Sequence, residues 1–180
     1  MPFRTVLVPI DLSPCSAQVL AHAVDLAIPT GARLILMTAV DTPLGVREDA
    51  PIRTSDDPEP VPAIEVLARD AHQRLLPFVR LAQQSGCRVE ERVGRGATAS
   101  SILHIAKELG ADLIVMGTHG RKGVARALLG SVAEAVLRDA TVPVMTVRSQ
   151  HEASCEAGSC AWCQLGVDAV QRQLQAELEG

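Results

Sequence analysis

Short runs of Val, Ile and Leu alternate along this sequence with longer segments whose apolar residues recur every three or four positions. The short runs predict β-strands at 5–10, 33–40, 87–93, 112–116 and 142–147. After their first residue the first and fourth runs are continuously apolar, which is typical of strands covered on both faces of a parallel sheet. The helical spacing predicts four helices between the five strands. We therefore expect a doubly wound α/β domain with right-handed crossovers and helices on both faces of the sheet.

Proline and glycine positions add detail at the ends of these elements. Ser13, followed by proline, predicts the start of the first helix. Gly86 and Gly110 stand where the second and third helices should end. Pro77 lies inside the second helical segment, where it predicts a kink or a break. Pro143 has no N–H to donate to a ladder, which places the last strand at an edge of the sheet.

Between residues 41 and 62 the periodic pattern stops. This segment is rich in proline and acidic residues, and a connection of this length is unusual inside a compact domain. We interpret the segment as a mobile loop, with a lid over a binding site as the alternative.

Composition narrows the class of protein. The 180 residues are 47% hydrophobic and 21% charged, which excludes a disordered chain. Only 2% are aromatic, which argues against ring-stacking sites for single-stranded nucleic acid or a flavin. A net charge of −4 gives no overall basic field, so we expect neither nucleic acid nor a membrane as a partner. No signal peptide, membrane-spanning run or disulfide framework is recognisable, and a cytoplasmic protein is expected.

A candidate site lies at the ends of the first and fourth strands. If the strand order is 3-2-1-4-5, these strands flank the point where the order reverses, and ligands of such sheets bind there. Asp11 follows the first strand and Gly117 follows the fourth. The carboxylate of Asp11 could accept hydrogen bonds from a sugar hydroxyl or a base amine.

The segment 117–131 carries chemistry suited to an anion. It contains several glycines, which allow a close approach of the backbone, and three cationic side chains. Ser131 and Glu134 form an S-x-x-E capping box, which predicts a helix start whose amides face an anion. A phosphate chain suits this combination, and we favour nucleotide binding over a purely structural glycine loop.

Three motifs resemble those of the universal stress protein family. Gly117-x2-Gly120-x9-Gly130-Ser131 matches the family's nucleotide signature G-2x-G-9x-G-(S/T). The opening Val8-Pro9-Ile10-Asp11 and the segment DLIVMGTHG are similar to its other hallmarks. The resemblance spans residues 3–148. It implies a five-stranded Rossmann-like fold of the adenine nucleotide alpha hydrolase type, a homodimer formed through the last strand, and the subgroup that binds ATP.

Carried over by position, the resemblance implies two groups of ligand-contacting residues. Those bordering the adenine and ribose would be Pro9, Ile10, Asp11, Val40, Met116 and Gly117. Those holding the phosphates, with a bridging Mg²⁺, would be Gly120, Arg121, Gly130, Ser131 and Val132. Val40 is equally well explained as a core residue, and Arg121 as a solvated loop charge.

These residues point to an ATP-binding stress or signalling protein whose nucleotide acts as a switch or a structural ligand. Catalysis is poorly supported, because His119 is the one obvious loop group that could orient a water molecule. The lysine-bearing phosphate loop of many nucleotide hydrolases is missing from the sequence. A slow ATPase is the alternative.

After residue 148 the sequence departs from the family pattern. His151, Cys155, Cys160 and Cys163 form a set sufficient for tetrahedral Zn²⁺, and Cys160-x2-Cys163 has a chelating spacing. A reversible disulfide and exposed thiols are the alternatives, so a redox- or metal-sensing regulator is a further hypothesis. Apolar residues at 167, 170, 174 and 178 then predict an amphipathic docking helix. We divide the chain into a nucleotide-binding domain at 1–148 and a Cys-rich extension at 149–180.

Overall fold

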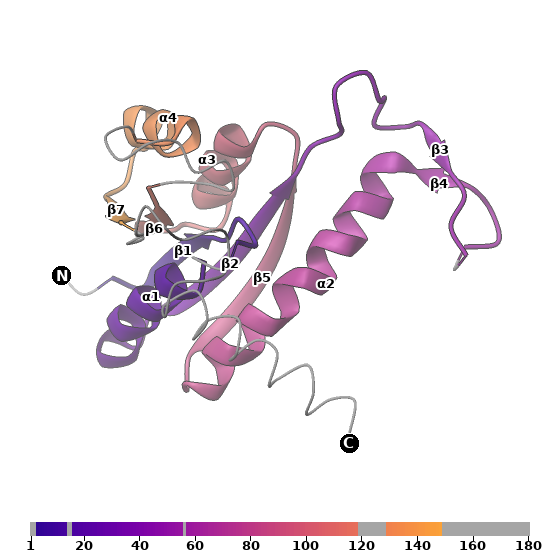
Figure 1. Cartoon of the computed structure of the whole chain (residues 1–180). Coiled ribbons are helices and arrows are strands. Elements are labelled where there is room, and N and C mark those ends of the chain that lie inside the picture. Colours follow the sequence, from indigo (N-terminus) through magenta and orange to yellow (C-terminus); the bar gives the residue numbers. More distant parts are fainter. Residues whose placement is uncertain (1–2, 14–15, 56, 119–128, 149–180) are drawn as a thin grey trace, which may run out of the picture.

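The protein folds around a five-stranded parallel sheet, seen in the computed structural model of Figure 1. The structure describes residues 3–13, 16–55, 57–118 and 129–148. The strands are β1 (Thr5–Pro9), β2 (Arg33–Val40), β5 (Arg88–Arg95), β6 (Leu113–Gly117) and β7 (Val144–Val147). The helices are α1 (Ser16–Thr30), α2 (Ala63–Gln84), α3 (Thr98–Glu108) and α4 (Ser131–Asp139). The observed order β5-β2-β1-β6-β7 confirms the predicted order 3-2-1-4-5.

Two apolar layers cover the sheet, one on each face. Successive side chains of a strand point to opposite faces, so Val6 and Val8 of β1 pack with α1 and α2. Leu7, which lies between them, packs on the other face with α3 and α4. Because both faces are covered, β1, β2 and β6 need apolar residues at consecutive positions. This is the physical reason for the continuous apolar runs in the sequence.

Glycine ends two of the helices as predicted. Gly86 has a φ of +89° and Gly110 a φ of +63°, a backbone region that favours glycine. The N–H of Cys87 donates to the carbonyl of Ala82 at 3.1 Å, closing a Schellman turn at the end of α2. These turns redirect the chain from each helix into the next strand.

The predicted break at Pro77 is wrong, because α2 runs without a break from Ala63 to Gln84, and a kink at this residue stays a prediction. A proline inside a helix removes the hydrogen bond to the carbonyl four residues earlier, here that of Gln73. Gln73 is an exposed residue, whereas Pro77 itself is buried. Leu75 and Phe78 beside the proline are buried in the core and hold the helix against the sheet. The lost bond is therefore offset by packing.

The segment 41–62 contains regular structure that its sequence pattern does not predict. β3 (Pro51–Ile52) and β4 (Val61–Pro62) pair antiparallel in a short hairpin beyond the start of α2, on the right of Figure 1. The N–H of Ala63 donates to the carbonyl of Ala50 at 2.8 Å, and that of Ile64 to Glu48 at 3.1 Å. These bonds satisfy backbone donors that the first turn of a helix leaves without intrahelical partners. The chain just before the hairpin thus replaces a side-chain cap on α2.

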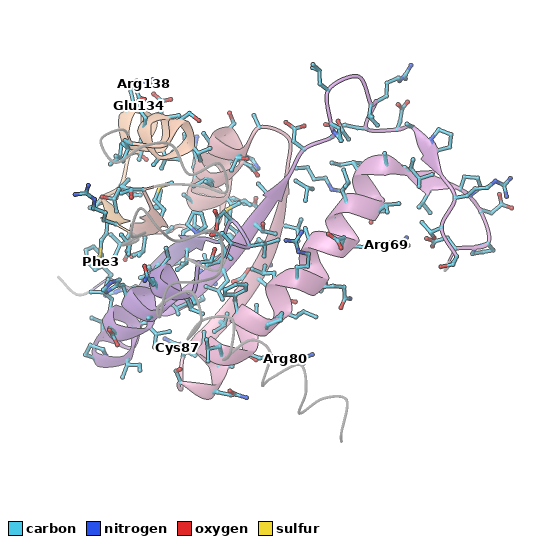
Figure 2. All side chains as sticks on the ribbon, in the orientation of Figure 1. Phe3, Arg69, Arg80, Cys87, Glu134 and Arg138 are labelled. Carbon is cyan, nitrogen blue, oxygen red and sulfur yellow. The ribbon has the colours of Figure 1, made fainter. Side chains whose placement is uncertain are left out.

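An ion pair joins this hairpin to Arg69 of α2, which is labelled in Figure 2, and gives a pH prediction. The Arg69 guanidinium donates to both carboxylate oxygens of Asp57, and with the Thr54 hydroxyl it lowers the pKa of that carboxyl. The stabilisation is complete above the unfolded-state pKa of about 3.9 and is lost as the pH falls through the lowered folded-state pKa. We expect Arg69→Leu to raise the Asp57 pKa in a carboxyl NMR titration. Arg47→Leu removes a different pair, with Asp49, and should leave that pKa unchanged; equal effects of the two substitutions would contradict the assignment.

The beginning of β1 is tied to the beginning of β6 by one carboxylate. Asp112 accepts the N–H of Arg4 at 2.8 Å and that of Thr5 at 3.0 Å, and its own N–H donates to the carbonyl of Thr5 at 2.9 Å. Asp112→Ala should therefore lower the free energy of unfolding by about 1 kcal/mol, measured by urea denaturation. Asp112→Asn keeps an acceptor and should lose less. An alanine variant as stable as the parent would show that water replaces the carboxylate at no cost.

The two edges of the sheet differ. β7 is at one edge, as Pro143 predicts, and the Pro143 carbonyl still accepts the N–H of Ile114 at 3.0 Å. β5 is at the other edge and carries charged residues of both signs. Its Glu90 pairs with Arg33 of β2 at 2.8 Å and also with Arg92. Within the described residues, no helix is both long enough and apolar enough to cross a bilayer.

Candidate functional site

The strand ends named in the sequence analysis lie together at the end of the sheet where the parallel strands have their carboxyl termini. β1 and β6 are parallel neighbours in which Leu7 pairs with Ile114, and this register places Pro9 beside Met116. The chain crosses to opposite sides of the sheet from these two strands, so the strand order reverses between them. The structure therefore brings Asp11 and Gly117 to the switch point, as predicted.

The residues named for the base and ribose differ in what they can present to a ligand. Ile10 and Met116 are only 2% and 4% exposed, so their side chains belong to the core. The N–H of Ile10 is also used, donating to the Met37 carbonyl at 2.7 Å. Val40 is half-buried at the end of β2, and its carbonyl accepts the N–H of Gly96 at 2.9 Å. The half-buried members of this group at the carboxyl ends of the strands are thus Pro9, Asp11, Val40 and Gly117.

Asp11 is held by its own turn. Its Oδ1 atom accepts the backbone N–H of Ser13 at 3.1 Å, the Ser13 hydroxyl at 2.7 Å and the Ser16 hydroxyl at 2.5 Å. Ser13, expected to begin the first helix, thus donates its hydroxyl hydrogen to Asp11, and the described part of α1 begins at Ser16. The sequence reasoning named Asp11 but missed both serines as its partners. The pattern D-x-S-x-x-S directly after a buried strand is the signal that could have found them.

The start of α4 is attached to the end of β6. The N–H of Gly130 donates to the carbonyl of Thr118 at 2.8 Å, and the N–H of Thr118 donates to Val147 of β7 at 3.0 Å. α4 therefore begins next to the carboxyl ends of β6 and β7. Gly120 and Arg121, predicted to hold phosphates, lie outside the described residues, as does His119.

The predicted capping box is wrong by one residue. Gly130 is the N-cap of α4, with φ −63° and ψ 146°, and no side chain caps the helix. Its carbonyl accepts the N–H of Glu134 at 2.9 Å, so Ser131 is already the first helical residue. Helix geometry gives the N–H groups of Ser131, Val132 and Ala133 no acceptor within α4. Together with the positive end of the helix dipole, these donors suit an anion.

The described residues thus place backbone donors at one end of the switch point and a fixed carboxylate at the other. This arrangement suits a ligand with an anionic group at one end and a hydroxyl or amine at the other. Among the described residues, no group of His, Cys, Asp and Glu side chains is arranged to hold a metal ion. His151, Cys155, Cys160 and Cys163 lie outside the described part of the chain.

Comparison with known proteins adds relatives of similar length. The chain is 30% identical over 148 residues to universal stress protein MJ0531 of Methanocaldococcus jannaschii, covering 81% of this chain and 82% of the relative. It is 31% identical over 148 residues to universal stress protein A homolog 1 of Coxiella burnetii, covering 82% of this chain and 97% of that one.

Solved structures share the fold. The structure of hypothetical protein MJ0577 superposes with a TM-score of 0.68 at 23% identity, over 84% of this chain and all of that one. A universal stress protein in complex with cAMP has a TM-score of 0.60 at 27% identity, over 83% of this chain and 99% of that one. The universal stress protein from Archaeoglobus fulgidus in complex with dAMP has a TM-score of 0.56 at 23% identity, over 81% of this chain and 98% of that one.

The sequence model of one family covers most of the chain. The model described as "Universal stress protein family" matches residues 2–148, which includes the whole sheet and all four described helices. This agrees with the motifs at the ends of β1 and β6 and with the strand order. The chain belongs to the universal stress protein family.

Proposed function

We propose that this protein binds an adenine nucleotide at the switch point between β1 and β6, and that the nucleotide acts as a regulatory ligand. The observation that carries the proposal is the attachment of α4 to the end of β6 through Gly130 and Thr118, beside the strand that ends before Asp11. The backbone N–H groups at the start of α4 and the carboxylate of Asp11 then lie at the same end of the sheet, at the carboxyl ends of β1 and β6. The cAMP complex of a 27% identical family member supports a ligand of this class.

The two ends of the nucleotide would meet different parts of the site. The backbone N–H groups of Ser131 and Val132 at the start of α4 would donate hydrogen bonds to the phosphate. Pro9, Asp11 and Val40 would border the adenosine, with the carboxylate accepting from a hydroxyl or an amine. Ser131 is exposed and its hydroxyl caps nothing, so it fits a hydrated Mg²⁺ carried with the phosphates. That ion would neutralise part of their charge.

Native mass spectrometry of the purified full-length protein tests the proposal most directly, because it reports bound nucleotide, metal and subunit count together. We expect a mass addition that matches an adenine nucleotide, or one that appears when AMP or ATP is added. If no adenine nucleotide binds at millimolar concentration, the proposal is wrong. Release of phosphate from labelled ATP in single-turnover assays, above the free-nucleotide background, would extend the function to slow hydrolysis.

We also propose that two copies pair through β7. This strand is an edge, and it presents Met145 with 37% of its surface exposed, while the neighbouring α4 exposes 42% of Leu137. An edge strand offers unpaired backbone groups to a second chain. The subunit count in the same native spectra tests the pairing, and Met145→Lys should shift it toward the monomer. A parent protein that is monomeric throughout would exclude it.

For the extension we propose a metal site, supported by its sequence spacing. His151, Cys155, Cys160 and Cys163 supply one imidazole and three thiolates, a set that Zn²⁺ prefers. Elemental analysis of protein purified without a histidine tag should find about one Zn²⁺ per chain, lost in Cys160→Ser. Cys87→Ser is the control, because burial raises the pKa of the Cys87 thiol and disfavours the thiolate that metals require. If the analysis finds neither zinc nor iron, the metal site is wrong, and the three cysteines form a disulfide or stay as free thiols.

A further inference from the structure

The turn after β1 contains a backbone conformation that needs an explanation. Leu12 has a φ of +60°, and within the described ranges it is the one non-glycine residue in the left-handed region. A Cβ disfavours this conformation, and such residues persist where the surrounding structure fixes them. The Leu12 side chain packs against the core layer formed with α1 and α2. Packing of Leu12 therefore anchors one side of the turn.

The other side of the turn is fixed by the Asp11 carboxylate. Three donors from two serines converge on one oxygen, Oδ1. Ser16 is only 2% exposed and is the first described residue of α1, so its hydroxyl has a fixed position. Ser13 donates from the turn itself, through both its N–H and its hydroxyl. The carboxylate can rotate only if it breaks bonds to a rigid helix and to a strained turn.

We propose that Ser13 and Ser16 are positioning residues that hold the Asp11 carboxylate in the orientation that receives the adenosine part of the nucleotide. The inference rests on the proposed function of the same site. A carboxylate on a free side chain would lose rotational freedom when a ligand bound, and that loss would reduce affinity. Here the two hydroxyls order the carboxylate before the ligand arrives. A site is selective when its contact groups are themselves held by a second set of hydrogen bonds.

The test is isothermal titration calorimetry of the full-length protein with AMP and with adenosine. Ser16→Ala removes one donor, and Ser13→Val removes the other hydroxyl. Ser13→Thr is isosteric with the valine variant but keeps the hydroxyl, so it separates hydrogen bonding from shape. Ser101→Ala is the matched control, because Ser101 is also a buried helical serine, 8% exposed, on the opposite layer of the sheet.

We expect Ser16→Ala and Ser13→Val each to weaken AMP binding about fivefold to tenfold, the effect of one ordinary hydrogen bond, because the hydroxyls act on the ligand only through Asp11. Adenosine binding should weaken by the same factor, because both ligands carry the part that meets Asp11. The phosphate that contacts α4 is present only in AMP and is not affected by these substitutions. Ser13→Thr and Ser101→Ala should stay within about twofold of the parent, since both keep every donor to Asp11. A threonine variant as weak as the valine variant would show that the position acts through shape.

The outcomes separate this inference from the proposed function. If the parent protein binds AMP and the Ser16→Ala and Ser13→Val variants bind it equally well, the positioning role is wrong and nucleotide binding stands. If the parent binds neither AMP nor adenosine, the proposed function fails first. Thermal unfolding of each variant shows whether it is folded. If Ser16→Ala does not fold, the comparison of Ser13→Val with Ser13→Thr, at a half-buried position, decides the matter.

Discussion

Replacing Gly130 with aspartate should weaken AMP binding about tenfold to a thousandfold without destabilising the fold. Gly130 is the N-cap of α4, and its φ of −63° and ψ of 146° are open to any residue. An aspartate there can accept the free amides of the first turn, which favours the helix by a few tenths of a kcal/mol. The same carboxylate takes the donors away from a phosphate and adds a like charge beside it. Binding and stability should therefore move in opposite directions.

Matched measurements make this prediction specific. Gly130→Asn introduces a neutral cap of the same size, so AMP binding should fall less than in Gly130→Asp. Adenosine binding should be unchanged in both variants, because adenosine lacks the phosphate. Raising the salt concentration should reduce the difference between the two variants, since it screens exposed charges. If Gly130→Asp binds AMP as tightly as the parent, the start of α4 is not the phosphate site.

Gly94→Ala should lower the free energy of unfolding by about 2 kcal/mol, the usual cost of overfilling a packed interior. Gly94 lies near the end of β5, under α3. A Cβ placed on it would stand 1.9 Å from the Ser101 hydroxyl oxygen, 3.1 Å from the Ser101 Cβ and 3.3 Å from the Met37 methyl carbon. Rotation of the hydroxyl can relieve the first contact but not the second. α3 must then move away from the sheet.

A second substitution identifies the contact responsible. Ser101→Gly removes both clashing atoms, at the cost of a glycine inside a helix. Urea denaturation of the parent, the two single variants and the double variant should give a coupling energy of about 1 kcal/mol in favour of the pair. Additive effects would mean that the cost of Gly94→Ala comes from elsewhere, for example from strand propensity.

Much of the fold could be predicted because it depends on residues that are neighbours in sequence. Runs of apolar residues identify strands that are buried on both faces, and Gly86 and Gly110 end helices through their own backbone conformation. The hairpin of β3 and β4 could not be predicted, because each strand has two residues and no period. Pro77 misled for a different reason. Its cost is offset by the packing of Leu75 and Phe78 in the core, which the order of residues does not reveal.

The candidate site was predictable to a similar extent. Asp11 and Gly117 could be brought together once the strand order was inferred, because the carboxyl ends of parallel strands lie at the same end of the sheet. The capping box at Ser131 failed because a bond from Gly130 to Thr118 fixes the N-cap one residue earlier. Contacts between distant residues, such as that between Gly94 and Ser101, leave no local pattern in the sequence. They become visible only when a strand and a helix are placed against each other.

The unequal edges of the sheet set a limit on the size of any assembly. Two copies that join through β7 about a twofold axis use up both β7 edges and leave β5 outermost on each side. β5 carries Arg88, Glu90 and Arg92, and charged side chains along an edge discourage the addition of a further strand. Growth of a continuous sheet would then stop at two copies. The charges on β5 would act as a barrier to fibre formation.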